Sequence, residues 1–114
     1  MSAEIISAMI NGAWRPRPLK NGEIYDFMDG YDACVYSDWK YPKGEHATYE
    51  IKTVEGKHHL EIKHPRNPIE PEIYEIIEIG EEEMTWEYSI GEDKKDRIKL
   101  KRFYLDGKPS KDDL

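Results

Sequence analysis

This chain of 114 residues lacks several features that mark common protein classes. It has one cysteine, Cys34, which excludes a disulfide within the chain and is typical of a reducing compartment. No stretch approaches the roughly 20 apolar residues of a membrane helix, and Ser2 to Ile10 lacks the basic start of a signal peptide. We therefore expect no membrane insertion and a cytoplasmic location, or export if a leader has been removed from the chain.

Basic charge is also scarce. The 17 Lys and Arg residues are outnumbered by 24 Asp and Glu residues, which gives a net charge of −7 and a pI of about 5.1. A protein that binds nucleic acid through its phosphates needs an excess of Lys and Arg, so this acidic balance argues against that class. At this length we expect one soluble domain with one modest core, over residues 1–107, followed by a flexible polar tail at 108–114.

The motifs of the common enzyme classes are missing too. The chain has no nucleophile elbow, no P-loop and no dinucleotide-binding glycine set. Its histidines, His46, His58, His59 and His64, match no zinc-ligand spacing, and we expect them on the surface or in loops. The prediction is a non-enzymatic protein with no catalytic residues, no metal and no cofactor. A hydrolase or metal enzyme built on clustered Glu and His is the third alternative.

What the chain does contain is a strong period of two. Along several segments apolar and polar residues alternate, as in the run from Ala47 to Lys52, which is the pattern of an antiparallel strand with one buried face. Before these segments, Ala3–Ile10 has apolar residues at helical spacing and predicts a short amphipathic helix. The predicted strands are Ala13–Arg17, Glu23–Asp29, Ala33–Trp39, His46–Thr53, His58–Lys63, Glu72–Ile79, Met84–Ile90 and Arg97–Tyr104.

Eight short strands with local connections predict an all-β fold, an antiparallel up-and-down barrel, because closure removes exposed sheet edges. Glycine-containing pairs such as Lys43-Gly44 are expected to form the turns. The prolines at 65, 68 and 71 predict a longer irregular crossing, since proline cannot donate to a strand ladder. Within Ile73–Ile79 the apolar residues change parity, which indicates either a β-bulge or a strand buried on both faces.

A family resemblance follows from particular residues. Gly12-Ala13-Trp14 on the first strand and Leu100-Lys101-Arg102 on the last, with Asp29-Gly30 after an aromatic strand, resemble the small bacterial lipocalin-like domains of the calycin superfamily, many of them of unknown function. The resemblance implies a closed barrel whose floor is plugged by Trp14, with the Arg102 guanidinium across the indole face, an arrangement that a cation–π attraction supports. No haem-binding signature accompanies it.

The aromatic residues of the strands are the candidate ligand-binding residues of the barrel interior. An eight-stranded barrel is just wide enough to be filled by side chains or to hold one small ligand. We therefore expect a non-enzymatic barrel that binds a small apolar or amphipathic molecule, or else a protein-interaction or structural module with a filled core, as a monomer or homodimer whose protein partner is unknown. The candidates are Phe27, Tyr36, Trp39, Tyr49, Trp86 and Tyr88.

Overall fold

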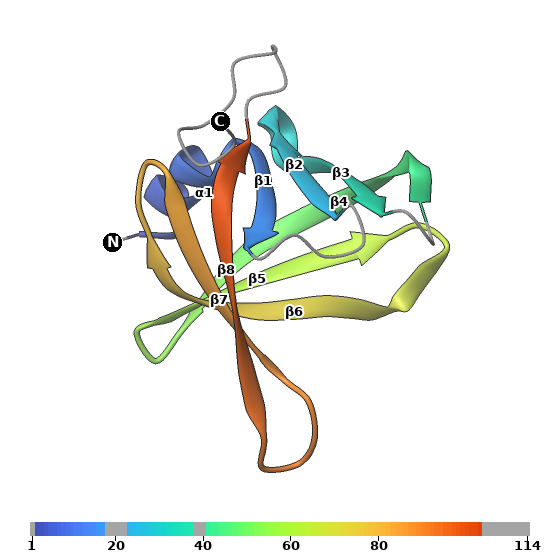
Figure 1. Ribbon diagram of the computed structural model, residues 1–114. Helices are drawn as coiled ribbons and strands as arrows, with labels where there is room; N and C mark the ends of the chain where they lie inside the picture. The colour runs from blue at the N-terminus through green and yellow to red at the C-terminus, as the bar shows by residue number, and fades with distance from the viewer. Residues whose placement is uncertain (1, 18–22, 38–40, 104–114) are drawn as a thin grey trace.

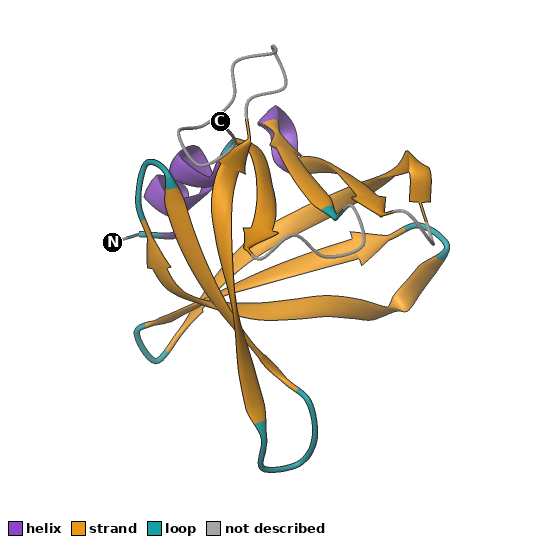
Figure 2. Ribbon diagram, in the orientation of Figure 1, coloured by secondary structure: helices purple, strands orange, loops and turns teal. Residues whose placement is uncertain are grey.

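Eight antiparallel strands close into one up-and-down barrel, and a short helix lies across one end (Figures 1 and 2). This computed structural model describes residues 2–17, 23–37 and 41–103. The predicted all-β fold class, with its helix, is confirmed. The elements are α1 (Ala3–Ile10), β1 (Gly12–Arg17), β2 (Ile24–Met28), a 3-10 turn (Asp29–Tyr31), β3 (Asp32–Ser37), β4 (Tyr41–Val54), β5 (Lys57–His64), β6 (Asn67–Ile79), β7 (Glu83–Ser89) and β8 (Lys95–Phe103).

Helix α1 begins and ends at the predicted residues. Ser2 caps its first turn, because its hydroxyl accepts a hydrogen bond from the amide of Ile5 at 3.2 Å. The side chains of Ile6 and Ile10 are buried against the barrel. A helix of two turns is unstable alone in water, so this docking is what holds it in place. None of the helices in the described residues is long and apolar enough to cross a membrane.

The barrel closes by pairing β1 with β8, where Trp14 lies opposite Arg102. Gly12 begins β1 with a φ of 117°, and a Cβ atom there would lie 2.6 Å from Nη1 of Arg102. Two features therefore require glycine at position 12, the backbone conformation and the close approach of the guanidinium. The Gly-x-Trp sequence thus places the indole and the arginine on one side of the sheet, inside the barrel.

Alternation along the strands sends one set of side chains into the core. Trp14, Phe27, Leu60, Ile62 and Trp86 are each at most 1% exposed. These residues come from β1, β2, β5 and β7, so the core is contributed by strands from all round the barrel. The tail predicted at 108–114 and the end of the domain predicted at 107 lie outside the described residues.

Strand β6 corrects one prediction and confirms another. The irregular crossing expected from 65 to 71 is wrong, because β6 already begins at Asn67, after a tight turn. The pairing with β5 shifts between Ile62 and His64, and residues 68–71 fall in that shifted stretch, where the prolines interrupt no regular ladder. Farther along, the pairing with β7 shifts between Ile76 and Glu78, which confirms a β-bulge.

Gly44 also corrects a prediction, because it lies inside β4 and forms no turn. Its φ is 84°, and a Cβ atom would lie 2.6 Å from Cε1 of Tyr36 and 2.9 Å from Sγ of Cys34. The glycine therefore lets β4 continue past the side chains of Tyr36 and Cys34 on β3. A turn residue and a close-approach residue look alike in sequence, because both are glycine at positive φ.

Strands β6 and β7 are not paired in the part of β6 that precedes Glu75. Their pairing runs only from Glu75 opposite Glu87 to Ile79 opposite Met84, and the earlier half of β6 pairs with β5 alone among the described strands. The hairpin of β7 and β8 projects away from the barrel at this point (Figure 1). We call the gap that opens here the β6–β7 notch.

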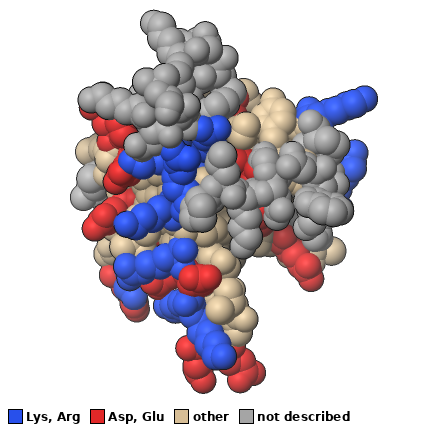
Figure 3. Space-filling model, in the orientation of Figure 1, with Lys and Arg blue, Asp and Glu red and all other residues tan. Residues whose placement is uncertain are grey.

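Basic side chains gather on the outer face of β8 and of the adjoining β1 (Figure 3). Arg97 and Lys95 of β8 lie 2.9 and 3.7 Å from carboxylate oxygens of Glu87 on β7, and Lys101 pairs with Glu83. Such exposed pairs set strand register more than stability.

Candidate functional site

The helix end of the barrel is sealed by Trp14 and Arg102. The indole is fully buried, and its Nε1 donates a hydrogen bond to the carbonyl of Ile10 at 2.8 Å. The guanidinium carbon lies 4.0 Å from the indole centroid, in cation–π geometry. Its nitrogens donate to the carbonyls of Met9 at 3.0 Å, Asn11 at 2.6 Å and Glu81 at 3.1 Å. The arginine therefore satisfies carbonyls at the end of α1 that the helix leaves unpaired.

Three of the predicted ligand-binding residues fill the interior next to this floor. Phe27, Tyr49 and Trp86 are at most 4% exposed, and their rings meet edge to face with centroids 5.1 Å (Phe27–Tyr49) and 6.3 Å (Phe27–Trp86) apart. The hydroxyl of Tyr49 lies 3.3 Å from Ser7 on α1. Edge-to-face rings at these distances pack against each other, so this half of the barrel is occupied by side chains.

The other predicted residues are placed differently. Tyr36 shares a face of β3 with Cys34, opposite to the buried Ala33 and Val35, so alternation puts it on the outer side of the barrel and not in the interior. Trp39 lies outside the described residues. Tyr88 has the inward parity of Trp86 but is only partly buried, at the end of the barrel far from α1.

Near that far end, polar side chains occupy inward positions. We call this set the polar cluster: Tyr25 of β2, Glu45 of β4, His64 of β5, and Glu72 and Tyr74 of β6. His64 stands between two carboxylates, with Nε2 2.6 Å from Glu72 and Nδ1 3.5 Å from Glu45. The hydroxyl of Tyr74 donates to the second oxygen of Glu72 at 3.0 Å and is hydrogen-bonded to Tyr25.

Glu45 is the exceptional member of the polar cluster. Its side chain is 9% exposed, yet neither carboxylate oxygen accepts a hydrogen bond from any described residue. The nearest cationic nitrogens are Nδ1 of His64 and, at 3.9 Å, Nε of Arg66, whose own side chain is 84% exposed. A buried carboxylate without hydrogen-bond donors costs stability, about 1–3 kcal/mol or more for a charged group.

A buried donor without an acceptor lies close to this cluster. Trp86 is fully buried, and its Nε1 has no hydrogen-bond partner among the described residues. Its ring stacks on Tyr74 with centroids 4.5 Å apart and meets Tyr25 edge-on at 5.0 Å. Trp86 therefore joins the packed aromatic half of the barrel to the polar cluster.

The tyrosines of this end are held neutral. Burial is the main cause that raises the pKa of Tyr25, and the charges of Glu72 and Glu23 raise it further. Burial likewise raises the pKa of Tyr74, and desolvation with the carboxylate of Asp96 raises that of Tyr88. At neutral pH these hydroxyls are hydrogen-bond donors and acceptors, not bases.

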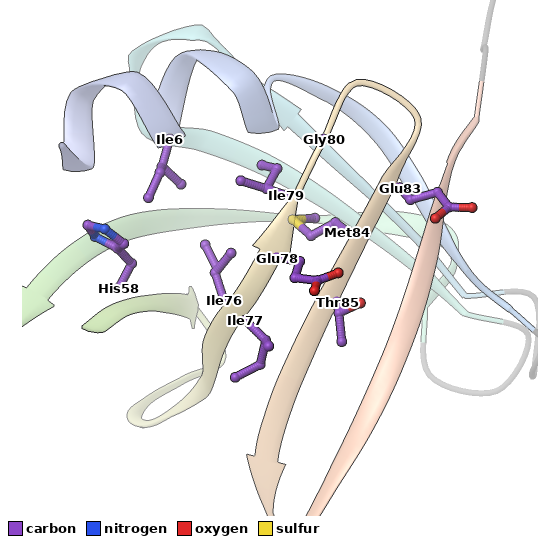
Figure 4. A pocket seen from close by; sticks show the side chains of 10 residues that line it. All are labelled: Ile6, His58, Ile76, Ile77, Glu78, Ile79, Gly80, Glu83, Met84 and Thr85. Carbon is purple, nitrogen blue, oxygen red and sulfur yellow. The ribbon is translucent and has the colours of Figure 1, made fainter. Parts of the chain in front are cut away.

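Two grooves lie near these features. One, of about 490 Å³, runs between α1 and the β6–β7 hairpin, where Ile6, Ile76 and Ile79 point toward one another (Figure 4). The other, of about 400 Å³, lies in the β6–β7 notch and is lined in part by Ile73 and Tyr88. The ring of Tyr88 is 6.1 Å from that of Tyr74, so Tyr88 borders both the notch and the polar cluster.

The sequence predictions missed the polar cluster. His64 was expected at the surface or in a loop, but it is 6% exposed and points inward. The signal was parity: His64 is two residues after the buried Ile62, and Glu45 two residues before the buried Ala47. A charged residue on an inward parity looks like the end of a strand, because nothing in sequence shows how far the barrel continues.

Among the described residues, no group of three or more His, Cys, Asp or Glu side chains is arranged to hold a metal ion. The polar cluster presents a buried carboxylate that accepts no hydrogen bond from the described residues, together with neutral phenols and aromatic faces. Comparison of the chain with protein-family models, with curated proteins and with solved structures found no match.

Proposed function

We propose that this protein is a lipocalin-like binding protein, not an enzyme, and that one small amphipathic molecule occupies the polar cluster. The observation that carries the proposal is the buried carboxylate of Glu45, which receives no hydrogen bond from the described residues. A feature that costs folding stability is retained where a ligand supplies the missing partner.

The surroundings of Glu45 favour an amphipathic ligand over a purely apolar one. Tyr25, Tyr74 and Trp86 supply aromatic faces, while Glu45 and Glu72 supply polar atoms at the same end of the barrel. Ligand sites combine an apolar lining with a few convergent polar groups in this way. The half next to α1 is filled with rings, which restricts the ligand to the polar end.

The same groups argue for binding over catalysis. The raised pKa values of Tyr25 and Tyr74 make both phenols poor bases and poor nucleophiles at neutral pH. His64 is engaged with the carboxylate of Glu72 at Nε2. Cys34 lies on β3, on the face of that strand opposite to its buried residues. The described hydroxyl that lies beside a histidine, that of Thr53 at 2.8 Å from Nδ1 of His58, is exposed and at the opposite end of β5 from His64.

Nuclear magnetic resonance of the intact protein tests the proposal. We expect one of three matched probes, phenethylamine, phenethyl alcohol or 3-phenylpropanoate, to shift the indole N–H resonance of Trp86 in a saturable one-to-one titration. The indole N–H of Trp14, already bonded to Ile10, serves as the internal control and stays in place. Trp86→Phe and Trp14→Phe variants assign the two resonances.

Binding at a different location would contradict the proposal. If the probes shift only methyl resonances of Ile76 and Ile79, the occupied site is the groove beside α1. If no probe shifts any resonance, and native mass spectrometry of freshly purified protein shows only the mass of the chain, the ligand-binding function fails.

A protein-interaction module is the second candidate function, and one observation favours it. Ile69, Ile73 and Ile90 are 88%, 54% and 55% exposed, which is unusual for isoleucine, and Ile73 lines the β6–β7 notch. Sedimentation of the wild type and of Ile73→Lys distinguishes the two candidates. A dimer that the substitution dissociates would favour the module, whereas a monomer in both would favour ligand binding.

A further inference from the structure

We infer that the polar group of the ligand is a protonated amine that hydrogen-bonds to the carboxylate of Glu45. This inference rests on the binding function proposed above and names the class of ligand. It starts from the lone acceptor already described: both Glu45 oxygens are buried and lack a donor. An ammonium group brings up to three N–H donors and a positive charge, so it can donate hydrogen bonds to the Glu45 oxygens and also attract their negative charge.

Among the described residues, the balance of charge at this end disfavours an anionic ligand. Besides Glu45 and Glu72, Glu23 and Asp96 lie near enough to raise the pKa values of Tyr25 and Tyr88 respectively. His64 is the only inward-facing group of the polar cluster that can carry positive charge. A carboxylate or phosphate would meet repulsion here, and a neutral hydroxyl would add no positive charge beside Glu45.

Among the described cations, Lys63 and most of the basic side chains of β1 and β8 lie on the other side of the sheet from Glu45. Lys63 is adjacent to His64 in sequence, but strand alternation turns it outward, where its Nζ lies 3.3 Å from Glu50. The basic side chains of β1 and β8 gather on the outer face of the barrel (Figure 3). Arg66 approaches Glu45 only at 3.9 Å from an exposed position. Among the described residues, His64 and Arg66 lie near Glu45 without a hydrogen bond to it, and a bound ammonium group would supply the missing donors.

Aromatic rings next to the carboxylates complete the recognition of an amine. Tyr74 lies between Trp86, at 4.5 Å, and Tyr88, at 6.1 Å, measured between ring centroids. Ammonium groups are attracted to aromatic faces, most strongly where water is excluded. The apolar part of the ligand extends along these rings toward the groove in the β6–β7 notch, which Tyr88 lines.

The probe series separates this inference from the binding function. Phenethylamine, phenethyl alcohol and 3-phenylpropanoate share an aromatic body and differ in the charge of the polar group. We expect phenethylamine to bind at least tenfold more tightly than the alcohol, with the acid weakest, in titrations that follow the Trp86 indole resonance. Equal binding of amine and alcohol, or tighter binding of the acid, would overturn the inference and leave the binding function standing.

Two variants locate the amine. Glu45→Gln keeps the shape of the side chain and removes its charge, and we expect it to weaken phenethylamine binding at least tenfold while the alcohol is unaffected. Glu50→Gln is the matched control, because Glu50 lies on the same strand with an exposed side chain; it leaves the affinity for both probes unchanged. Undiminished amine binding by a folded Glu45→Gln protein would overturn the assignment to Glu45.

Failure of the binding function looks different. In that case none of the three probes shifts Trp86 in the wild type, whatever the charge. Should Glu45→Gln fail to fold, the comparison of amine with alcohol on the wild type still decides the charge of the polar group. Glu72→Gln then tests where the amine binds. A tenfold lower affinity for phenethylamine supports binding in the polar cluster, and an unchanged affinity overturns it.

Discussion

At the helix end of the barrel, the guanidinium of Arg102 donates to three backbone carbonyls, and the indole of Trp14 donates to a fourth. At the polar end, Glu45 and Trp86 leave a buried acceptor and a buried donor without partners among the described residues. The two ends are built on the same strands and share one aromatic core. The difference shows that the polar groups of one end are satisfied by the protein's own residues, whereas the other end keeps buried polar atoms without hydrogen bonds, as the binding function proposed above requires.

The largest expected effect comes from removing the floor. Trp14→Ala deletes a fully buried indole with its cation–π and hydrogen-bond partners, and we expect it to lower the free energy of unfolding by about 3–5 kcal/mol. Urea denaturation followed by circular dichroism measures the change. A loss below 1 kcal/mol would show that the helix end is not the stabilising end.

The next largest effect is expected from substitution of Gly12, which lies against the guanidinium of Arg102. Gly12→Ala places a Cβ atom against Arg102 at a φ of 117°, so we expect a loss of about 1–3 kcal/mol. Gly91→Ala is the matched control, because no atom lies within 4 Å of its Cβ position. The same denaturation experiment should place the control within about 0.5 kcal/mol of the wild type.

At the polar end the sign is expected to reverse. Glu45→Gln removes a buried charge that receives no hydrogen bond, and we expect the free energy of unfolding to rise by about 1 kcal/mol. A destabilised variant would mean that the ion pair with His64 outweighs the desolvation of the carboxylate, and the contrast between the two ends would then disappear.

The smallest effect belongs to the outer surface, which serves as the reference for both ends. The hydrogen bond from Arg97 is the main cause that lowers the pKa of Glu87. A carboxyl group whose pKa is lower in the folded state adds stability above its unfolded pKa of about 4.3, and this stability is lost as the pH falls through the folded pKa. Unfolding measured from neutral to acidic pH should show a shallower decline in Glu87→Gln. An unchanged slope in that variant would show that the pair contributes nothing.

The sequence carried more of the fold than of the candidate site. The helix and the eight strands follow from local patterns, since periodicity and glycine positions report on neighbouring residues. The pairing of Trp14 with Arg102 was implied by the family resemblance. The polar cluster was missed because Glu45, His64 and Glu72 come from three strands, and each looks like an exposed residue within its own segment. The irregular crossing predicted from the prolines at 65, 68 and 71 was wrong for a similar reason. Proline marks an interrupted strand ladder, and only the register of β5 with β6 shows that the strand continues past it.

By itself the sequence determined the strand count, the inward side of most strands and the helix that covers one end, because these depend on side-chain period and on turn-forming residues. Only the tertiary structure decided which inward positions are deep enough to be dry, and which polar atoms there find partners. Burial and hydrogen bonding depend on how strands distant in sequence are aligned, so the isolation of Glu45 appears only once the barrel has closed.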